Sequence, residues 1–460
     1  MGQLIASISG IRGIVGDSLT PEVVIAYVSA FARWCGGGSV VIGYDGRPSG
    51  EAIMDLARAT LRLCGVDVVD IGMAPTPTVQ LAVEHSTARG GIAITASHNP
   101  GEWNGLKFLN DGGVFLGAEE NASLFALVAA GERAWMPAVG MGTHTHRYDA
   151  VADHIERVLA CEVVDVMRIR ARRFRVVVDA VNASGSVAVP ALLRELGCEV
   201  IEAACDGSGE FPHTPEPLPE NLTSLGDAVR AQRADLGIAV DPDADRIVLF
   251  DERGLPFGEE YSITTAVHAV LEALPEGERA DAGIVVNLST TRAVDDVAAR
   301  HGATVHRAPV GEINVVRAML AQRAVVGGEG SGGVILPAVH AGRDSLVGAA
   351  LVLQALSGFS GPASAFRATL PEWVIRKFRY GIEGLDAAAV LRRVAESYAN
   401  ERVDTRDGVR IDFADGWVHV RSSNTEPIMR VIAEARSADE ATTLARAVAE
   451  RAFAGTNVRI

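Results

Sequence analysis

The sequence predicts an α/β protein built from several domains with largely parallel sheets. The chain has 460 residues, more than one hydrophobic core usually accommodates, and domain-size statistics favour three or four domains. Apolar residues make up 48% of the chain and aromatic residues only 5%, a mixture suited to layers packed with aliphatic side chains. The third observation is a repeated unit of strand, polar turn, helix, glycine and strand.

The repeated unit occurs three times, the last copy being the faintest. The copies begin with apolar strands at residues 40–45, 175–179 and 283–287. A glycine follows each expected helix and supplies the left-handed residue that ends it: Gly65, Gly197 and Gly302. Because a helix that links two strands in this way joins parallel neighbours, we expect three similar α/β domains.

The C-terminal part of the chain has a different pattern. Short alternating segments indicate antiparallel strands at residues 408–413, 416–421 and 427–434, and a helix is expected at 438–452. These elements predict a smaller α+β domain that begins near Pro371. The expected linkers are the polar or glycine-rich stretches 143–149, 254–256 and 357–364.

The charge balance limits the partners of the chain. Lys and Arg total 42 against 58 Asp and Glu, a net charge of −16, so most of the surface should repel nucleic acid and anionic lipid. An anionic small molecule can bind only where basic groups, backbone N–H groups or a metal cluster locally. The five cysteines form no Cys-x-x-Cys pair, and no targeting or membrane-spanning segment is evident, so we expect a cytoplasmic protein that uses neither membrane nor nucleic acid.

The first segment that could take part in a reaction is an apolar strand that ends in Thr95-Ala96-Ser97-His98-Asn99-Pro100. Ligands of parallel sheets bind beyond the carboxyl ends of strands, where Ser97 would be exposed beside His98. Lys107 follows closely enough to share such a site. The same residues also suit a hydrogen-bonded turn, and no Gly-x-Ser-x-Gly elbow surrounds the serine.

The second segment places Asp241, Asp243 and Asp245 in a tight loop between two apolar strands. Three close carboxylates repel one another, and a hard divalent cation offsets that repulsion. Oxygen ligands favour Mg²⁺ over Zn²⁺. An EF-hand is rejected because Arg246 stands where that loop needs glycine and the flanks are strands. A solvated acidic turn is the alternative, and Arg246 would pair with the carboxylates or hold an anion.

The third and fourth segments are candidate ligand loops. The glycine-rich stretch 326–334 lacks the Gly-Lys-Ser/Thr of a phosphate-binding loop, and its Glu329 and Ser331 suit sugar hydroxyls; a flexible hairpin is the alternative. The stretch 421–427 places hydroxyl and amide side chains between Arg421 and Arg430, which favours a phosphate cradle over a simple turn. Weaker features are Arg12 in a glycine-flanked loop and an expected Asp45–Arg47 pair across a turn.

Taken in order, these four motifs resemble those of the α-D-phosphohexomutase superfamily, which includes phosphoglucomutases, phosphomannomutases and phosphoglucosamine mutases. The resemblance covers nearly the whole chain. It implies four domains around a central cleft: three related α/β domains with mixed, mostly parallel sheets and a smaller C-terminal α+β domain. We expect these domains, with the phosphoserine, metal-binding, sugar-binding and phosphate-binding loops respectively, at residues 1–148, 149–254, 255–368 and 369–460.

The resemblance also implies an activity, the interconversion of hexose 1-phosphates and hexose 6-phosphates through phosphorylated Ser97 and a sugar bisphosphate. It implies Mg²⁺ on Ser97, Asp241, Asp243 and Asp245, with a hexose bisphosphate as activator. Catalytic roles fall on Arg12, Ser97, His98, Lys107 and Arg246, with Lys107 a general acid or base. Substrate contacts fall on Glu329, Ser331, Arg421, Ser423, Asn424, Thr425 and Arg430.

Three departures from the family pattern concern the sugar. Gly333 and Glu312 stand where many members have histidine, and Asn287 stands where a lysine is common. The sugar loop is similar to that of an archaeal-like branch, so we expect conversion of glucosamine 6-phosphate to glucosamine 1-phosphate. Mannose or glucose phosphates with the same mechanism are the alternative.

Two rival functions remain, a metal-dependent sugar phosphatase and a non-catalytic sugar-phosphate-binding protein. The second phosphate cradle disfavours the phosphatase, because a hydrolase need not hold a second phosphate. The intact serine and three aspartates disfavour the binding protein. The partner we expect is a small sugar phosphate, and the chain is expected to be a monomer or a homodimer.

Overall fold

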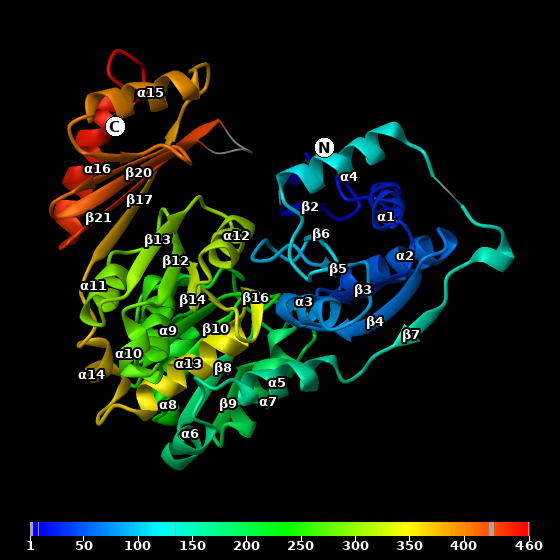
Figure 1. The fold of residues 1–460 in the computed structure, drawn as a ribbon, viewed down its shortest axis with the longest axis horizontal. Coiled ribbons are helices and arrows are strands. Elements are labelled where there is room, and N and C mark those ends of the chain that lie inside the picture. The colour runs from blue at the N-terminus through cyan, green and yellow to red at the C-terminus, as the bar shows by residue number, and fades with distance from the viewer. Residues whose placement is uncertain (1–2, 8, 134, 423–426, 459) are drawn as a thin grey trace.

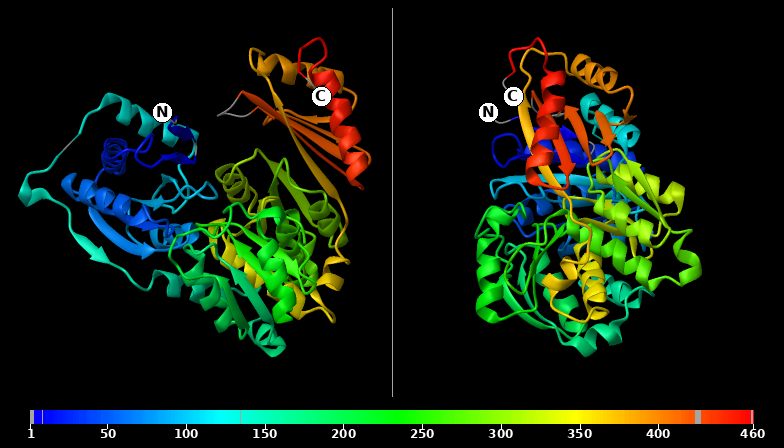
Figure 2. Two further views of the ribbon diagram at one scale, coloured as in Figure 1. Left: turned by 180° about the vertical axis from the view of Figure 1, so that it is seen from behind. Right: turned by 90° about the vertical axis from the view of Figure 1, so that its left-hand side faces the viewer.

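The computed structural model describes residues 3–7, 9–133, 135–422, 427–458 and 460. Its strands form four sheets that follow one another along the chain, with helices packed on their faces (Figure 1). The N-terminal and C-terminal sheets lie apart from each other, with the two middle sheets between them along the chain (Figure 2). The predicted fold class, three α/β domains and a smaller α+β domain, is confirmed. Within the described ranges, no helix is long and apolar enough to cross a membrane.

The first sheet has seven strands in the order β1-β2-β6-β5-β3-β4-β7. Its strands are β1 (Ile5–Ser7), β2 (Gly10–Ile14), β3 (Ser39–Tyr44), β4 (Asp67–Met73), β5 (Gly90–Ile94), β6 (Trp103–Leu109) and β7 (His144–His146). Its helices are α1 (Pro21–Cys35), α2 (Gly50–Leu63), α3 (Thr76–Glu84) and α4 (Ala118–Ala130), with a 3₁₀ turn, η1 (Ala138–Gly140). The stretch expected to be a linker differs: β7 pairs in parallel with β4 and so covers the edge of the sheet.

The second and third sheets are also mixed. The second, β11-β10-β8-β9, contains β8 (Arg175–Asp179), β9 (Glu199–Ala204), β10 (Leu236–Val240) and β11 (Ile247–Asp251). The third, β13-β12-β14-β15-β16, contains β12 (Gly283–Asn287), β13 (Thr304–Ala308), β14 (Val326–Glu329), β15 (Gly333–Leu336) and β16 (His340–Arg343). The glycines expected to end the helices, Gly65, Gly197 and Gly302, have φ angles of 79°, 76° and 72°.

The helices of this middle region cover both sheets. Those before β12 are α5 (Ala150–Ala160), α6 (Val166–Arg172), α7 (Gly185–Glu195), η2 (Pro219–Asn221), α8 (Thr223–Gln232), α9 (Glu260–Ala273) and α10 (Glu276–Arg279). Those after it are α11 (Ala293–Arg300), α12 (Glu312–Gln322), α13 (Ser345–Ser357) and α14 (Ala363–Arg367).

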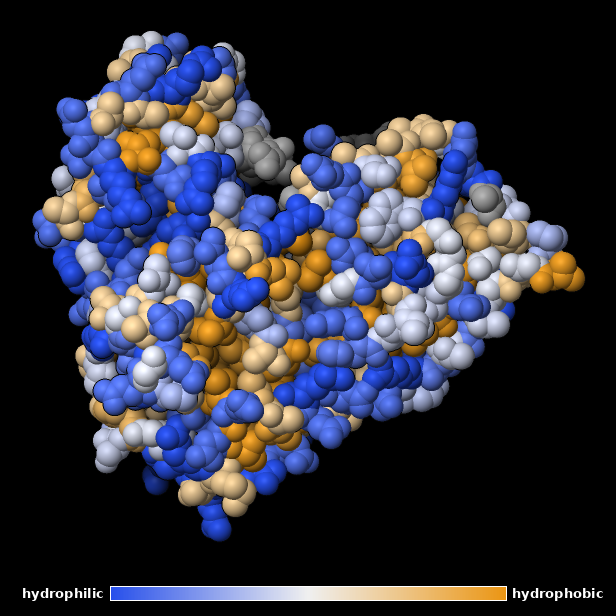
Figure 3. Space-filling model, viewed as in Figure 1, coloured by the Kyte–Doolittle hydropathy of each residue, from blue (hydrophilic) through white to orange (hydrophobic). Residues whose placement is uncertain are grey.

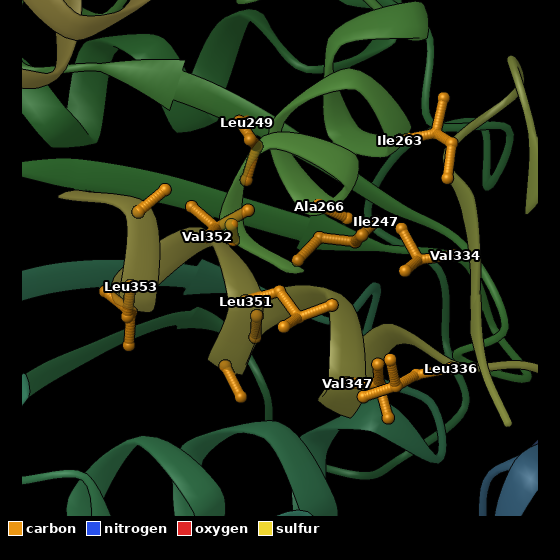
Figure 4. Packing of buried hydrophobic residues seen from close by; sticks show 14 of the residues in the cluster. Ile247, Leu249, Ile263, Ala266, Val334, Leu336, Val347, Leu351, Val352 and Leu353 are labelled. Atoms are coloured by element: carbon orange, nitrogen blue, oxygen red, sulfur yellow. The ribbon is translucent and has the colours of Figure 1, made fainter. Parts of the chain in front are cut away.

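Helix α13 joins the two middle sheets into one core. Every residue from Ser345 to Leu356 is buried. Figure 4 shows Val352 of α13 beside Leu249 of β11, and Val347 of α13 beside Leu336 of β15. One continuous cluster of buried apolar side chains therefore serves both sheets.

The fourth sheet is antiparallel throughout, in the order β17-β21-β20-β19-β18. Its elements are β17 (Val374–Gly381), α15 (Ala387–Ser397), β18 (Arg402–Asp404), β19 (Val409–Phe413), β20 (Gly416–Ser422), β21 (Ile428–Ala435) and α16 (Ala438–Ala452). The predicted strands and final helix are present. Strands β17 and β18 and helix α15 were not predicted from the sequence.

Candidate active site

A pocket of about 440 Å³ lies where the four sheets face one another, and the surface is hollowed there (Figure 3). All four parts of the chain contribute to its wall. The predicted site residues that line it are Arg12, Ser97, His98, Lys107, Arg246, Glu329, Ser331, Arg421 and Arg430. The predicted Ser423, Asn424 and Thr425 lie outside the described residues.

Ser97 lies three residues beyond the end of β5, and its φ of 50° is unusual for a residue other than glycine. Arg47 fixes this loop from behind, since its guanidinium donates hydrogen bonds to the carbonyls of Ser97, Asn99 (2.8 Å), Pro100 (2.7 Å) and Trp103 (3.2 Å). The expected Asp45–Arg47 pair exists at 2.9 Å and is buried. The loop therefore holds Ser97 in a strained conformation at the pocket wall.

The hydroxyl of Ser97 faces the acidic loop of the second sheet. Its Oγ donates to Asp241 Oδ2 at 3.1 Å and lies 3.3 Å from His98 Nδ1. Asp241, Asp243 and Asp245 are buried, and each offers a carboxylate oxygen within 4.8 Å of the others. The predicted serine and carboxylates are thus brought together from two domains.

These carboxylates suit a hard cation. Asp243 Oδ1 and Asp245 Oδ1 are buried without a hydrogen-bond partner among the described residues, an arrangement that costs free energy unless a ligand fills it. Burial and the other two carboxylates raise the pKa of Asp241 well above its usual value. An oxygen-only, crowded and incompletely satisfied set of donors fits Mg²⁺.

Lys107, on β6, reaches the same cluster. Its Nζ donates to Asp243 Oδ2 at 2.6 Å and lies 3.5 Å from Asp245 Oδ2. Although burial alone would lower the pKa of Lys107, the two carboxylates raise it above its ordinary value, so the amine carries a proton. Lys107 and Ser97 line the same pocket, so this protonated amine stands within the site.

The side of the pocket around Ser97 is electropositive. Burial and then the charge of Arg246 lower the pKa of Arg12, whose Nη1 donates to Asn99 Oδ1 at 3.0 Å. Burial, Arg246 and Arg12 lower the pKa of His98 to about 2, so its imidazole is neutral. Two crowded guanidiniums favour an anion in front of the serine.

The third sheet contributes a buried arginine that the sequence analysis did not assign to the site. Arg343 contacts Asp245 at 2.6 Å, Glu329 at 2.8 Å and Glu312 at 3.1 Å. These carboxylates hold the pKa of Arg343 above its ordinary value against the effect of burial. Asn287 Nδ2 also donates to Glu329 Oε1 at 2.9 Å. Two of the departures noted in the sequence, Glu312 and Asn287, therefore belong to the support of the sugar loop.

The fourth sheet presents a row of arginines that the sequence revealed only in part. Arg430 of β21 pairs in register with Arg421 of β20 on one side and with Arg379 of β17 on the other. Asp407 accepts two bonds from Arg421, each at 3.0 Å. Like charges on adjacent strands repel, so this arginine row is suited to a bound anion. Arg379 was missed because β17 was missed.

Comparison with known proteins points to one family along nearly the whole chain. Family models for phosphoglucomutase/phosphomannomutase match in order: α/β/α domains I, II and III at residues 4–134, 152–254 and 257–372, and the C-terminal domain at 382–451. The chain is 38% identical over 451 residues to a phosphoglucomutase/phosphomannomutase of Thermococcus kodakarensis, covering 96% of each chain. It is 36% identical over 440 residues to a probable phosphoglucosamine mutase of Methanopyrus kandleri, covering 94% of each.

A solved structure agrees with these relatives. A phosphoglucomutase/phosphomannomutase family protein of Burkholderia thailandensis superposes with a TM-score of 0.85 at 27% identity, covering 99% of this chain and 100% of the other. The fold and the comparisons define an intramolecular phosphotransferase, an enzyme of the isomerase class. The chain belongs to the phosphoglucomutase/phosphomannomutase family and is a phosphohexomutase.

Proposed function

We propose that this phosphohexomutase interconverts hexose 1-phosphate and hexose 6-phosphate through phosphorylated Ser97 and a sugar bisphosphate. One observation carries the proposal: a single pocket is lined both by Ser97, whose hydroxyl bonds to the acidic cluster buried behind it, and by the arginine row. A substrate with a phosphate at one end and a hydroxyl at the other fits between them. A phosphatase has no use for the arginine row.

In the proposed reaction, the arginine row holds the phosphate already on the sugar. The free sugar hydroxyl attacks the phosphorus on Ser97, so a new P–O bond forms while the bond to Oγ breaks. The hydroxyl loses its proton to a base in the pocket, and Oγ regains one from Lys107. His98, whose low pKa makes it a poor base, contacts Oγ and helps to orient it. Arg12 and Arg246 offset charge on the transferring group. The bisphosphate then turns end for end and returns its other phosphate to Ser97.

Enzymes of this family depend on a metal ion. We propose Mg²⁺, held by Asp241, Asp243, Asp245 and an oxygen of phosphorylated Ser97. Its bound charge would offset the carboxylates and the phosphoryl group. A hexose bisphosphate would act as activator, because it loads an unphosphorylated Ser97. We further propose a cytoplasmic monomer or homodimer whose partner is the sugar phosphate alone.

The proposed sugar is glucosamine phosphate, and Glu260 is the residue that would recognise its amino group. Glu260 lines the pocket directly against Gly330 of the sugar loop, and its Oε2 accepts a bond from Thr291 N at 2.9 Å. Burial raises the pKa of Glu260 to about 8, so a nearby ammonium group would restore its charge. Mannose and glucose phosphates are the alternative substrates.

The mechanism is tested with Ser97→Ala. We expect loss of nearly all mutase turnover with sugar phosphate binding retained, and loss of label transfer from a ³²P-labelled bisphosphate to the protein. Ser86→Ala, in the same domain but outside the pocket, is the control and should keep both. Near-normal turnover in Ser97→Ala, or net release of phosphate by the wild type in place of isomerisation, would refute the mechanism.

The sugar is tested separately with Glu260→Gln. Loss of a charged hydrogen bond should lower kcat/KM for glucosamine 6-phosphate by about tenfold or more. Values for glucose 1-phosphate and mannose 1-phosphate should change less than about twofold, well below the loss expected for a charged partner. Equal losses on all three substrates would contradict the assignment of Glu260 to the amino group.

A further inference from the structure

Two parallel helices of the third domain bring three metal-ligating side chains together away from the pocket. At their first turns, α9 and the segment that leads into α11 meet where Thr291 N bonds to Glu260. At their far ends, α9 supplies His268 and Glu272, and His301 follows the last residue of α11. Because residues four apart share one helix face, His268 and Glu272 both point toward α11.

The ligand atoms of this His–Glu–His cluster (His268, Glu272 and His301) lie close enough for one ion. One nitrogen or oxygen from each residue lies within 4.8 Å of the other two. Glu272 Oε1 is 3.5 Å from His301 Nε2, and the His301 side chain is only 9% exposed. His268 Nδ1 is buried and has no hydrogen-bond partner in the described part of the chain. Burying an imidazole nitrogen in this state is costly unless something binds it.

The surroundings favour a cation. Glu272 and His301 stand at helix C-terminal ends, where the carbonyl dipoles present partial negative charge. Among described residues, the Glu272 carboxylate has no ion pair with lysine or arginine. The nearby guanidiniums are turned to other acceptors: Arg279 to the carbonyls of Glu272 and Leu274, and Arg300 to that of Thr369.

A second histidine cluster provides a contrast. Asp70 of β4 lies beside His144 and His146 of β7, and their ligand atoms meet the same distance limit. The Asp70 carboxylate, however, already receives Arg58 Nη2 at 2.7 Å. That guanidinium neutralises the carboxylate and would repel a metal ion, so we assign no ion to this cluster.

We propose that the His–Glu–His cluster binds a divalent transition metal, and that Zn²⁺ suits it best. Two imidazoles and one carboxylate form a common three-residue zinc set, with water in the fourth position. This site is separate from the oxygen-only acidic cluster, and it has no part in phosphoryl transfer. A bound ion would tie together the far ends of two helices whose near ends meet at Glu260, which lines the pocket and accepts the bond from Thr291 N.

The test is zinc binding by the full chain after chelator treatment, with Mg²⁺ in excess to fill the acidic cluster. Calorimetry should detect one zinc ion per chain, and Co²⁺ should give the visible absorption of a nitrogen- and oxygen-bound ion. Glu272→Gln and His301→Ala should each weaken zinc binding by at least about tenfold. The matched control, His144→Ala with His146→Ala, should bind zinc as the wild type does.

Three outcomes would overturn the proposal. They are no zinc binding in excess Mg²⁺, unchanged affinity in Glu272→Gln, and loss of binding in the control instead. Glu272 is half-exposed, so Glu272→Gln should fold. This variant therefore tests zinc binding even if His301→Ala fails to fold. Mutase activity need not change in any of these variants, which separates this test from that of the proposed function.

Discussion

Arg343 shows how much of this site depends on single buried charges. Its guanidinium touches carboxylates from the acidic loop (Asp245), the glycine-rich loop (Glu329) and the start of α12 (Glu312). Removing one member of a buried charged network leaves the other charges unpaired in a low dielectric. The resulting loss of stability is larger than the sum of the separate contacts suggests. Burial raises the pKa of one of those partners, Glu312, to about 7 even with the arginine present.

We predict that Arg343→Leu lowers the free energy of unfolding by about 3–5 kcal/mol. The comparison is Arg33→Leu, which removes an ion pair whose side chains are 44% and 68% exposed and should cost less than about 1 kcal/mol. Urea denaturation of both variants measures the difference. Similar small losses in the two would mean that water reaches the carboxylates around Arg343.

A second prediction concerns His340, which is buried beside Asp344. Burial lowers the pKa of His340 from 6.5 to about 4. The unfolded chain therefore binds a proton near pH 6.5 and the folded chain only near pH 4. The resulting stability is present above pH 6.5 and is lost as the pH falls toward 4.

His340→Gln should remove this dependence, which is worth on the order of 1–3 kcal/mol. The measurement is the free energy of unfolding of both proteins at several values between pH 7.5 and pH 4. The difference between wild type and variant should shrink as the pH falls. A constant difference would show that His340 does not titrate on unfolding in this window.

At the scale of elements, the loop that contains Ser97 is held in place by a dense set of buried hydrogen bonds. Arg47 reaches four of its carbonyls, while Asp45 accepts bonds from both Arg47 and Thr95 Oγ1, the latter at 2.6 Å. These contacts fix the position of Ser97 without touching substrate. Arg47 is therefore a positioning residue for the serine.

We predict that Arg47→Lys lowers kcat by about tenfold or more, because a lysine cannot reach four carbonyls and misplacement near 1 Å is costly. KM should change much less, since Arg47 does not line the pocket. Arg58→Lys, in the same domain but bonded to Asp55 and Asp70, is the control and should retain kcat. Equal kcat values in wild type and Arg47→Lys would show that the loop holds its shape alone.

The elements also show what the sequence could and could not predict. The acidic loop, the serine loop and the hairpin of β19 and β20 were predictable because their signals lie within a few neighbouring residues. Strand β17 was missed although its sequence carries a local signal, because Lys377 and Arg379 alternate with Phe378 and Tyr380, which pack against the core of the fourth sheet. The role of Arg343 was missed because its partners lie 14, 31 and 98 residues away in sequence. Roles that arise from packing of distant segments leave no local pattern.

At the scale of the whole molecule, one large core is shared by two of the four sheets. The middle two sheets share the core around α13, whereas the fourth sheet packs with α15 and α16 in a cluster of its own. Folding cooperativity follows continuous apolar packing, so the middle sheets should open together.

We predict that Leu351→Ala, at a fully buried position of α13, destabilises both middle sheets by about 2–5 kcal/mol. Amide hydrogen exchange should speed up in β8 and β12 alike and stay unchanged in β19 and β20. Val420→Ala, buried in the fourth sheet, should give the reverse pattern. Faster exchange in only one middle sheet would show that the two unfold separately.

The residue at the end of the first strand of each repeat plays the same structural part in all three domains. Asp45, Asp179 and Asn287 come at the end of the first repeat strand in each domain, and each holds a different neighbour: Thr95 before the serine, His213, and Glu329 of the sugar loop. One ancestral unit copied twice would keep such an anchor while the loop it steadies acquired a new task. The chemistry at this position matches the neighbour that each residue holds: the two aspartates accept hydrogen bonds, whereas the Asn287 amide donates one to the Glu329 carboxylate.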